Sequence, residues 1–180
     1  MPKILCGIDE AGRGCIGGYL AVAGVVLQDN IDGLNDSKKL TEAKREELSQ
    51  LIKSHSSYHI VLTSSQTIDE IGLSQAIKNS ILEIKNQIQA ETYLMDGNTN
   101  FGIEGVEFKI KADATIKEVS AASILAKVAR DKMFEALDSS YDVYEFHKHK
   151  GYLTKRHIEL LKQYGLSDQH RHSYKVKSLN

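Results

Sequence analysis

The stretch that decides the fold is KILCGIDEAGRG, residues 3–14, where an apolar run leads directly into two acids and a glycine-rich turn. An apolar run of this length that ends at turn residues is typical of a buried strand, so we predict a strand over residues 3–8. Asp9 and Glu10 close that strand, and the turn predicted over residues 12–18 reverses the chain. The segment therefore predicts the start of a sheet with acids at the tip of its first strand.

Strand and helix patterns follow each other along the rest of the chain. Leu73, Ile77 and Ile81 recur at the steps of an amphipathic helix, whereas YHIVLT, residues 58–63, is typical of a strand. Strands are predicted over residues 19–28, 58–63, 92–95 and 106–111, and helices over residues 41–52, 73–88, 116–137 and 154–164. The early strands form a hairpin-like run and the later ones alternate with helices. This order predicts an α/β fold with a mixed sheet.

Length and composition exclude several classes of protein. With 180 residues, of which 41% are hydrophobic and 26% charged, the chain suits one globular domain spanning residues 1–180. Its two cysteines, Cys6 and Cys15, are too few for a disulfide framework, and Cys6 is expected in the core. No apolar run approaches the ~20 residues of a membrane span, and residues 1–8 lack a signal peptide's basic start. We expect a cytoplasmic monomer with no membrane partner.

Positive charge is concentrated at the C-terminal end. Residues 141–180 hold eight Lys and Arg against four acids, which is +4 and leaves −5 for the first 140 residues of a chain with net charge −1. The same segment holds five of the seven histidines. It is interpreted either as a basic segment that contacts nucleic acid or as a solvated helix face followed by a loose end.

Acidic residues stand at the ends of three predicted elements. Asp9 and Glu10 follow one strand, Asp96 ends another at YLMDGN, and Asp113 follows the strand that ends at Lys111. Converging carboxylates are the ligands that Mg²⁺ or Mn²⁺ takes beside phosphate. The alternative is that Asp96 forms a turn and Asp113 caps a helix. Because neighbouring strand residues point to opposite faces, Asp9 and Glu10 share a site only if the chain twists there.

The turn itself, Gly12, Arg13 and Gly14, has the composition of an anion-facing loop. Glycines let a backbone approach a ligand closely, and arginine suits phosphate. The spacing is neither that of a P-loop nor that of a dinucleotide fingerprint.

Six motifs, taken together, resemble ribonuclease HII, the type 2 ribonuclease H. They are IDEAGRG at 8–14, DSKKL at 36–40, MDGN at 95–98, KAD at 111–113, SAASILAKVARD at 120–131 and HKGY at 149–152. The resemblance extends from Ile4 to about Tyr174. It implies a ribonuclease H-like fold, with a central mixed sheet flanked by helices and a helical C-terminal segment. The implied enzyme is a metal-dependent endonuclease that hydrolyses the RNA strand of RNA/DNA hybrids. It also cuts 5′ of single ribonucleotides in duplex DNA, leaving 3′-hydroxyl and 5′-phosphate ends, a role in DNA replication and repair.

The resemblance also implies roles for individual residues. The family's catalytic, metal-binding carboxylates correspond to Asp9, Glu10, Asp96 and Asp113, and a two-metal site with Mg²⁺ or Mn²⁺ is expected, bridged by Asp9. The turn that reads the ribose 2′-hydroxyl corresponds to Gly12, Arg13 and Gly14, and the tyrosine at the cleaved junction to Tyr152. Further contacts to the nucleic-acid backbone are expected from Ser37, Lys38, Lys39, Ser120 and Ser123. The expected partners are RNA/DNA hybrids and DNA duplexes that contain ribonucleotides.

Two other functions are compatible with this fold. A type 3 ribonuclease H usually carries an additional N-terminal substrate-binding domain, and only eight residues precede Asp9. A non-catalytic hybrid-binding module would have little reason to keep all four acids. In addition, Cys15 and Leu153 stand where many ribonucleases HII have proline, and HRHSY at 170–174 replaces the more usual HRRSF.

Several residues keep two interpretations. Lys127 and Arg130 face either phosphate or solvent, while Asp131 is expected to pair with one of them rather than bind metal. The histidine pairs at 147 and 149 and at 170 and 172 alternate, which suits surface or phosphate contacts better than zinc. On sequence alone, Tyr152 is equally a packing residue.

Overall fold

A computed structural model describes residues 4–34 and 39–177, and a mixed five-stranded sheet lies at its centre. The strands are β1 (Leu5–Ala11), β2 (Leu20–Leu27), β3 (Ser56–Thr63), β4 (Thr92–Asp96) and β5 (Val106–Lys109), in the order β3-β2-β1-β4-β5. Strand β1 pairs antiparallel with β2 and parallel with β4, which confirms the predicted mixed sheet.

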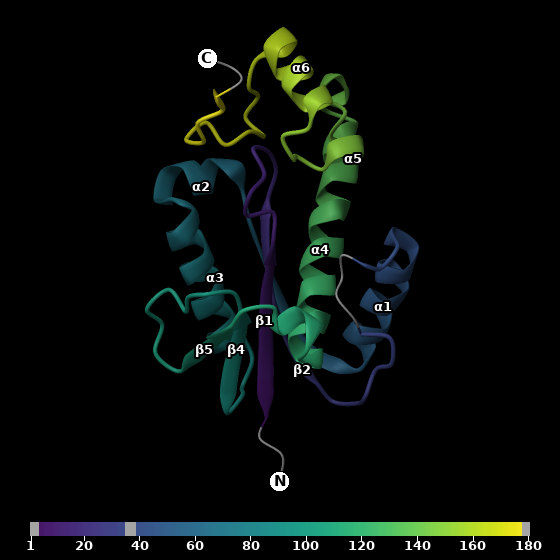
Figure 1. Ribbon diagram of the computed structural model, residues 1–180, viewed down its shortest axis with the longest axis vertical. Coiled ribbons are helices and arrows are strands. Elements are labelled where there is room, and N and C mark those ends of the chain that lie inside the picture. The colour runs from purple at the N-terminus through teal and green to yellow at the C-terminus, as the bar shows by residue number, and fades with distance from the viewer. Residues whose placement is uncertain (1–3, 35–38, 178–180) are drawn as a thin grey trace.

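Helices cover both faces of this sheet, as Figure 1 shows with the sheet nearly edge-on. They are α1 (Glu42–Ser54), α2 (Ser65–Ile71), α3 (Leu73–Gln87), α4 (Lys117–Asp138), α5 (Phe146–His149) and α6 (Lys155–Tyr164), with 3₁₀ turns η2 (Ala112–Ala114) and η3 (Asp142–Tyr144). Helices α2 and α3 lie on one side, and α4 and α1 on the other (Figure 1). The short helix α2, capped by the Ser64 side chain, lies in a segment for which the sequence predicted no helix.

Alternation along β1 separates the two hydrophobic layers. Cys6 and Ile8 belong to the core beneath α3, as expected for Cys6. Gly7 faces α4 instead, where an added Cβ would lie only 2.2 Å from the main chain of Glu118. The alanines of α4, Ala121, Ala122 and Ala126, are fully buried against β2, so small residues on both partners bring this helix close to the sheet.

A third hydrophobic cluster forms the C-terminal end of the molecule. It joins the end of α4 to α5, α6 and the segment that follows, through Ile16, Phe134, Phe146, Leu161 and Val176. This arrangement confirms the predicted helical C-terminal segment, which lies beyond the turn that follows β1 (Figure 1). Among the described residues, no helix has both the length and the apolar character needed to cross a lipid bilayer.

Strand β1 is longer than predicted and positions the acids differently. It continues to Ala11, so Asp9 and Glu10 lie inside a strand, paired with Ala23 and Val22 of β2. On its other side, parallel pairing sets Ile8 opposite Met95. The next residue on each strand is an aspartate, so the register itself brings Asp9 and Asp96 together.

Candidate active site

Three carboxylates from separate elements meet at one edge of the sheet. Oxygens of Asp9 on β1, Asp96 at the end of β4 and Asp113 in η2 all lie within 4.8 Å of one another. The chain reaches η2 from β5 through Lys111, which takes a left-handed conformation with φ of 59° and so turns the backbone towards β4. Predicted element ends that are far apart in the sequence therefore form one acidic cluster.

Glu10 is not a member of that cluster. As strand alternation requires, its side chain leaves β1 on the opposite face from Asp9, where Arg13 lies 3.3 Å from Oε1. It nevertheless lines the same cavity as Asp9 and Asp96. Its Oε2 atom is buried and, within the described residues, has no hydrogen-bond partner. A buried carboxylate oxygen without a donor is suited to bind a cation.

Burial and mutual repulsion destabilise the charged form of these acids. The pKa of Asp9 is held well above its ordinary value, first by burial and then by the charges of Glu10 and Asp96, against a hydrogen bond from Ser123. Burial also raises the pKa of Glu10, opposed by Arg13. A bound divalent cation would relieve both effects, so the donor set and its electrostatics fit Mg²⁺ or Mn²⁺.

The glycine-rich turn forms one wall of the cavity, whose volume is about 280 Å³. Gly12 needs its glycine for structural reasons: its φ is 95°, and an added Cβ would lie 2.2 Å from Nε of Arg130. Gly14 is different, because an added Cβ would meet nothing within 4 Å. The exposed backbone at Gly14 is thus free to be approached by a ligand, and Arg13 lines the cavity between the two.

Tyr152 forms another part of the cavity wall. Its side chain lines the cavity and is 45% exposed, so packing alone does not account for it. The ring stands 5.4 Å from the guanidinium carbon of Arg130. Burial, together with the neighbouring buried Cys15, raises the pKa of Tyr152. An anchored ring with an open face is suited to stacking.

The other predicted contact residues are not equivalent. Ser123 lines the cavity and hydrogen-bonds to Asp9, whereas Ser120, one turn earlier on α4, is 2% exposed and does not reach the cavity. Lys39 is exposed and does not line the cavity either. Ser37 and Lys38 lie outside the described residues.

Two cationic side chains complete the cavity. Lys127 is bonded to Asp131 at 2.7 Å, which confirms the predicted pairing of that acid, and it also lines the cavity. Arg45 of α1, which sequence reasoning missed, lines the cavity while donating 2.6 Å from Nη1 to the carbonyl of Leu40. Leu40 is the last residue of DSKKL, so an arginine soon after that motif was the available signal.

Two arginines occupy positions that their charge did not suggest. Arg130 is fully buried and donates to the carbonyls of Tyr19 and Lys150, so neither a phosphate-facing nor a solvated Arg130 is correct. Arg171 of the basic segment is also fully buried and donates to the carbonyls of Arg13 and Gly18. These two cations hold the glycine-rich turn rather than a polyanion.

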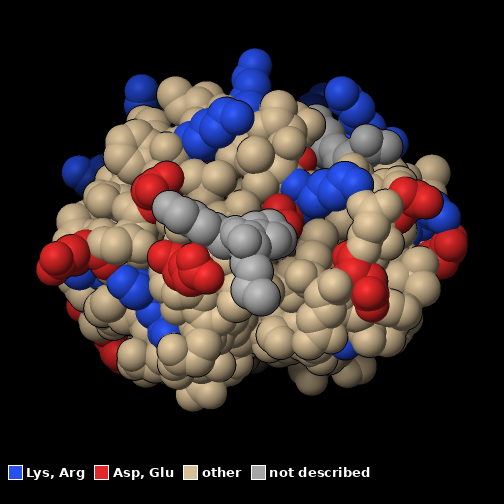
Figure 2. All heavy atoms as spheres, turned by 90° about the horizontal axis from the view of Figure 1, so that it is seen from below, with Lys and Arg blue, Asp and Glu red and all other residues tan. Residues whose placement is uncertain are grey.

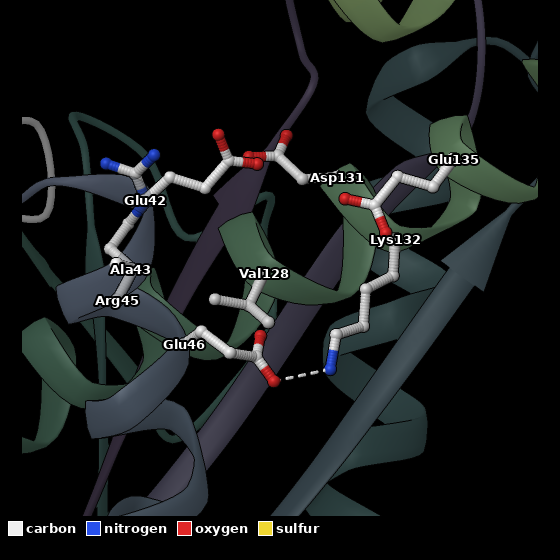
Figure 3. A pocket seen from close by; sticks show the side chains of 8 residues that line it. All are labelled: Glu42, Ala43, Arg45, Glu46, Val128, Asp131, Lys132 and Glu135. Atoms are coloured by element: carbon white, nitrogen blue, oxygen red, sulfur yellow. Dashed lines mark hydrogen bonds and ion pairs between the residues drawn. The ribbon is translucent and has the colours of Figure 1, made fainter.

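A second cavity, of about 210 Å³, lies between α1 and α4 (Figure 3). Four acids line it, namely Glu42, Glu46, Asp131 and Glu135, against two bases, Arg45 and Lys132. Lys132 is bound to Glu46 at 2.6 Å, as the dashed line in Figure 3 marks. This excess of carboxylates repels nucleic acid. On the face seen in Figure 2, acidic and basic side chains are interspersed and form no broad basic surface.

Comparison with known proteins agrees with this geometry. The ribonuclease HII family model matches residues 6–177. A ribonuclease HII from Aliarcobacter butzleri is 56% identical over 98% of this chain and 93% of its own length, and one from Sulfurovum is 49% identical over 99% and 95%. The PCNA:RNase HII complex from Archaeoglobus fulgidus superposes with a TM-score of 0.84 at 29% identity, covering 97% of this chain and 96% of that one. The chain belongs to the ribonuclease HII family, the endonucleases that hydrolyse RNA in RNA/DNA hybrids.

Proposed function

We propose that this enzyme cuts both continuous RNA/DNA hybrids and single ribonucleotides embedded in duplex DNA, on the 5′ side of the ribonucleotide. The observation that supports this is one cavity lined by Asp9 and Asp96 of the acidic cluster, by the turn at residues 12–14 and by Tyr152. The carboxylates that would support phosphodiester cleavage and the residues that would contact the ribose are therefore close enough to act on the same nucleotide.

The carboxylates Asp9, Glu10, Asp96 and Asp113 are assigned as metal ligands, with Asp9 as the bridging one. Asp9 lies within 4.8 Å of both Asp96 and Asp113 through its carboxylate oxygen and lines the same cavity as Glu10, which supports that assignment. Bound Mg²⁺ or Mn²⁺ would supply an activated water and charge stabilisation at the leaving oxygen. Hydrolysis breaks the bond between phosphorus and the 3′-oxygen of the preceding nucleotide. The water's hydroxyl stays on the 5′-phosphate, and its proton ends on the 3′-hydroxyl.

Ribose recognition is assigned to the turn and to Tyr152. A 2′-hydroxyl both donates and accepts a hydrogen bond, so it distinguishes RNA from DNA. Backbone groups at Gly12 and Gly14 bind it without a side chain in the way, and the Tyr152 ring stacks on the adjoining sugar. Arg13, Arg45 and Lys127 line the same cavity, which supports their assignment to the flanking phosphates.

Gel analysis of a labelled DNA duplex with one ribonucleotide, in Mg²⁺, in Mn²⁺ and in chelator, tests the proposal. We expect a single metal-dependent cut 5′ of the ribonucleotide, with a product that a polymerase extends from its 3′-hydroxyl. An all-DNA duplex and a continuous hybrid serve as controls. Cleavage of the hybrid without cleavage of the embedded ribonucleotide contradicts the proposed specificity, and binding without cleavage would favour the hybrid-binding module. Replication and repair, a cytoplasmic location and the monomeric state stay predictions.

A further inference from the structure

Three buried histidines form a compact group behind the Tyr152 wall of the cavity. The rings of His149 and His157 stack with centroids 3.8 Å apart, and Nε2 of His157 lies 3.0 Å from Nε2 of His170. His157 and His170 are fully buried, and His149 nearly so. None of them lines the catalytic cavity, so their role is not direct contact with substrate.

Hydrogen-bond partners fix where the proton sits on each ring. Nδ1 of His170 accepts from the main-chain N–H of Ser167 at 2.9 Å, so the proton of a neutral His170 is on Nε2. That Nε2–H donates to Nε2 of His157, which places the His157 proton on Nδ1. Nδ1–H of His157 then donates to the carbonyl of Tyr152 at 2.9 Å. The bonds run in one direction, from Ser167 to Tyr152.

Both rings are neutral in the folded protein. Burial lowers the pKa of His157 to about 4, and burial together with His157 lowers that of His170 to about 3. A neutral imidazole has one donor and one acceptor nitrogen, so two facing Nε2 atoms require opposite tautomers.

Further hydrogen bonds hold the backbone groups around Tyr152. Its N–H donates to the carbonyl of His149 at 2.9 Å, and its carbonyl also accepts from the N–H of Thr154 at 2.8 Å. The preceding Gly151 donates its N–H to Nδ1 of His149 at 3.2 Å. Histidine side chains therefore orient the backbone on both sides of a ring that is itself half exposed.

The other end of this chain of bonds reaches the glycine-rich turn. His170 pairs through its backbone with Gly17, and the N–H of Arg171 donates to the carbonyl of Ile16 at 2.7 Å. The Arg171 side chain donates 3.2 Å to the carbonyl of Arg13. One short segment, residues 167–171, is thus bonded both to the turn and, through two histidines, to Tyr152.

We propose that His157 and His170 are positioning residues: His170 fixes the tautomer of His157, and His157 holds the Tyr152 backbone at a set distance from the Gly-Arg-Gly turn. The two walls that meet the ribonucleotide are then joined through this segment, in addition to the direct bonds from the N–H groups of Ile16 and Gly17 to the carbonyl of Gly151 at 3.1 and 3.3 Å. Their separation therefore does not depend on the metal ligands. The inference rests on the proposed contact between Tyr152 and substrate.

Two substitutions of His157 separate its bonds. His157→Asn places an amide donor where Nδ1 was and keeps the hydrogen bond to the carbonyl of Tyr152. His157→Gln keeps the contact with His170 but loses the hydrogen bond to the carbonyl of Tyr152. For His157→Gln we expect kcat on the single-ribonucleotide duplex to fall about ten-fold with little change in KM, and His157→Asn to retain most of kcat. His55→Gln, at an exposed histidine, is the matched control. Equal losses in the Asn and Gln variants overturn the inference.

A coupling measurement distinguishes positioning from general destabilisation. If His157 acts through Tyr152, adding His157→Gln to Tyr152→Ala slows cleavage no further, and multiplying losses overturn the inference. A Tyr152→Ala enzyme with full activity contradicts the proposed role of Tyr152 and takes the inference with it. A slow Tyr152→Ala enzyme beside a fully active His157→Gln enzyme contradicts the inference alone.

Imidazole ¹⁵N spectra of the unsubstituted enzyme test the tautomers without any variant that has to fold. We expect the proton on Nδ1 in His157 and on Nε2 in His170. The reverse pair of tautomers, or a charged ring at neutral pH, overturns the inference.

Discussion

The main-chain N–H of Ala112 donates a 2.7 Å hydrogen bond to Oδ1 of Asp96. This bond ties the end of β4 to η2, and the residue after Ala112 is Asp113. Two of the three clustered carboxylates are therefore fixed relative to each other by the main chain, without a bound cation. The position of Asp9 relative to this pair is set by the register of β1 against β4.

Removing one carboxylate charge from the site is expected to slow cleavage while raising the stability of the fold. Asp9→Asn keeps the size of the side chain but removes a ligand charge, so we expect cleavage in Mg²⁺ to fall by at least ~10²-fold. Because the pKa of Asp9 is raised by burial and by neighbouring acids, its charged form costs stability above that pKa. The metal-free variant is therefore expected to melt at a higher temperature than the parent at pH 7. Glu107→Gln, at an exposed acid of β5, is the control. Near-normal cleavage by Asp9→Asn contradicts the ligand assignment.

The two glycines of the turn are expected to respond differently to alanine. Gly12→Ala forces a side chain into a left-handed conformation and against Arg130, so it should lower the free energy of unfolding by about 1–3 kcal/mol. Gly14→Ala meets open space and should leave melting unchanged while slowing cleavage, because its methyl group stands where the ribose approaches. Denaturant unfolding and turnover, measured on both variants, test this. A fully active Gly14→Ala enzyme would remove Gly14 from ribose recognition.

Tyr152 should contribute through its hydroxyl and its ring separately. Tyr152→Phe loses one hydrogen bond, worth about 1 kcal/mol, so a several-fold slower cleavage is expected with folding preserved. Tyr152→Ala also loses the contact between the ring and the adjoining sugar, and should cost more on a single embedded ribonucleotide than on a continuous hybrid. Turnover of both substrates is compared with thermal melting. Equal losses on both substrates, together with a large drop in melting temperature, would assign Tyr152 to packing.

The basic C-terminal segment is tested at its exposed lysines, since Arg171 is buried. Lys175 and Lys177 are both exposed. If each contacts a phosphate, the double change to Gln should reduce the slope of log affinity against log salt by about 0.9 per contact. Binding to a hybrid is measured in chelator, where cleavage does not interfere. Lys78→Gln on α3 is the control. An unchanged slope would mean that these lysines belong to a solvated end.

Acid should weaken the fold through the buried histidines. Their pKa values, about 4 for His157 and about 3 for His170, lie below the ordinary 6.5, so the unfolded chain binds protons first as the pH falls. Their contribution is complete above pH 6.5 and declines below it, by up to about 1.4 kcal/mol per pH unit for each ring. Melting between pH 7 and 5 should therefore fall less steeply in His157→Asn than in the parent. An identical pH dependence would mean that folding does not lower the pKa of His157.

Local sequence patterns were sufficient for the elements and for the chemistry of the site. Short apolar runs predicted β2 and β4, and three- and four-residue steps predicted α3, because such patterns are set within one element. The acids at the predicted element ends were recognisable for the same reason. The resemblance to the ribonuclease HII motifs then identified them as catalytic carboxylates. Helix α2 was missed because SQTIDEI is too short to display a period.

Positions that depend on distant segments were decided by the tertiary structure alone. The sequence determined that Asp9, Glu10, Asp96 and Asp113 are present and predicted them at the ends of elements, although Asp9 and Glu10 lie inside β1. Strand register and the turn at Lys111 decided that three of them meet while Glu10 approaches from the other face. From their charge alone, Arg130 and Arg171 were expected at the surface. Both are buried, because burial depends on which segments pack over a residue and not on its charge. The direction of the histidine bonds likewise exists only once Ser167, His170, His157 and Tyr152 are adjacent, because a neutral ring takes its tautomer from its neighbours.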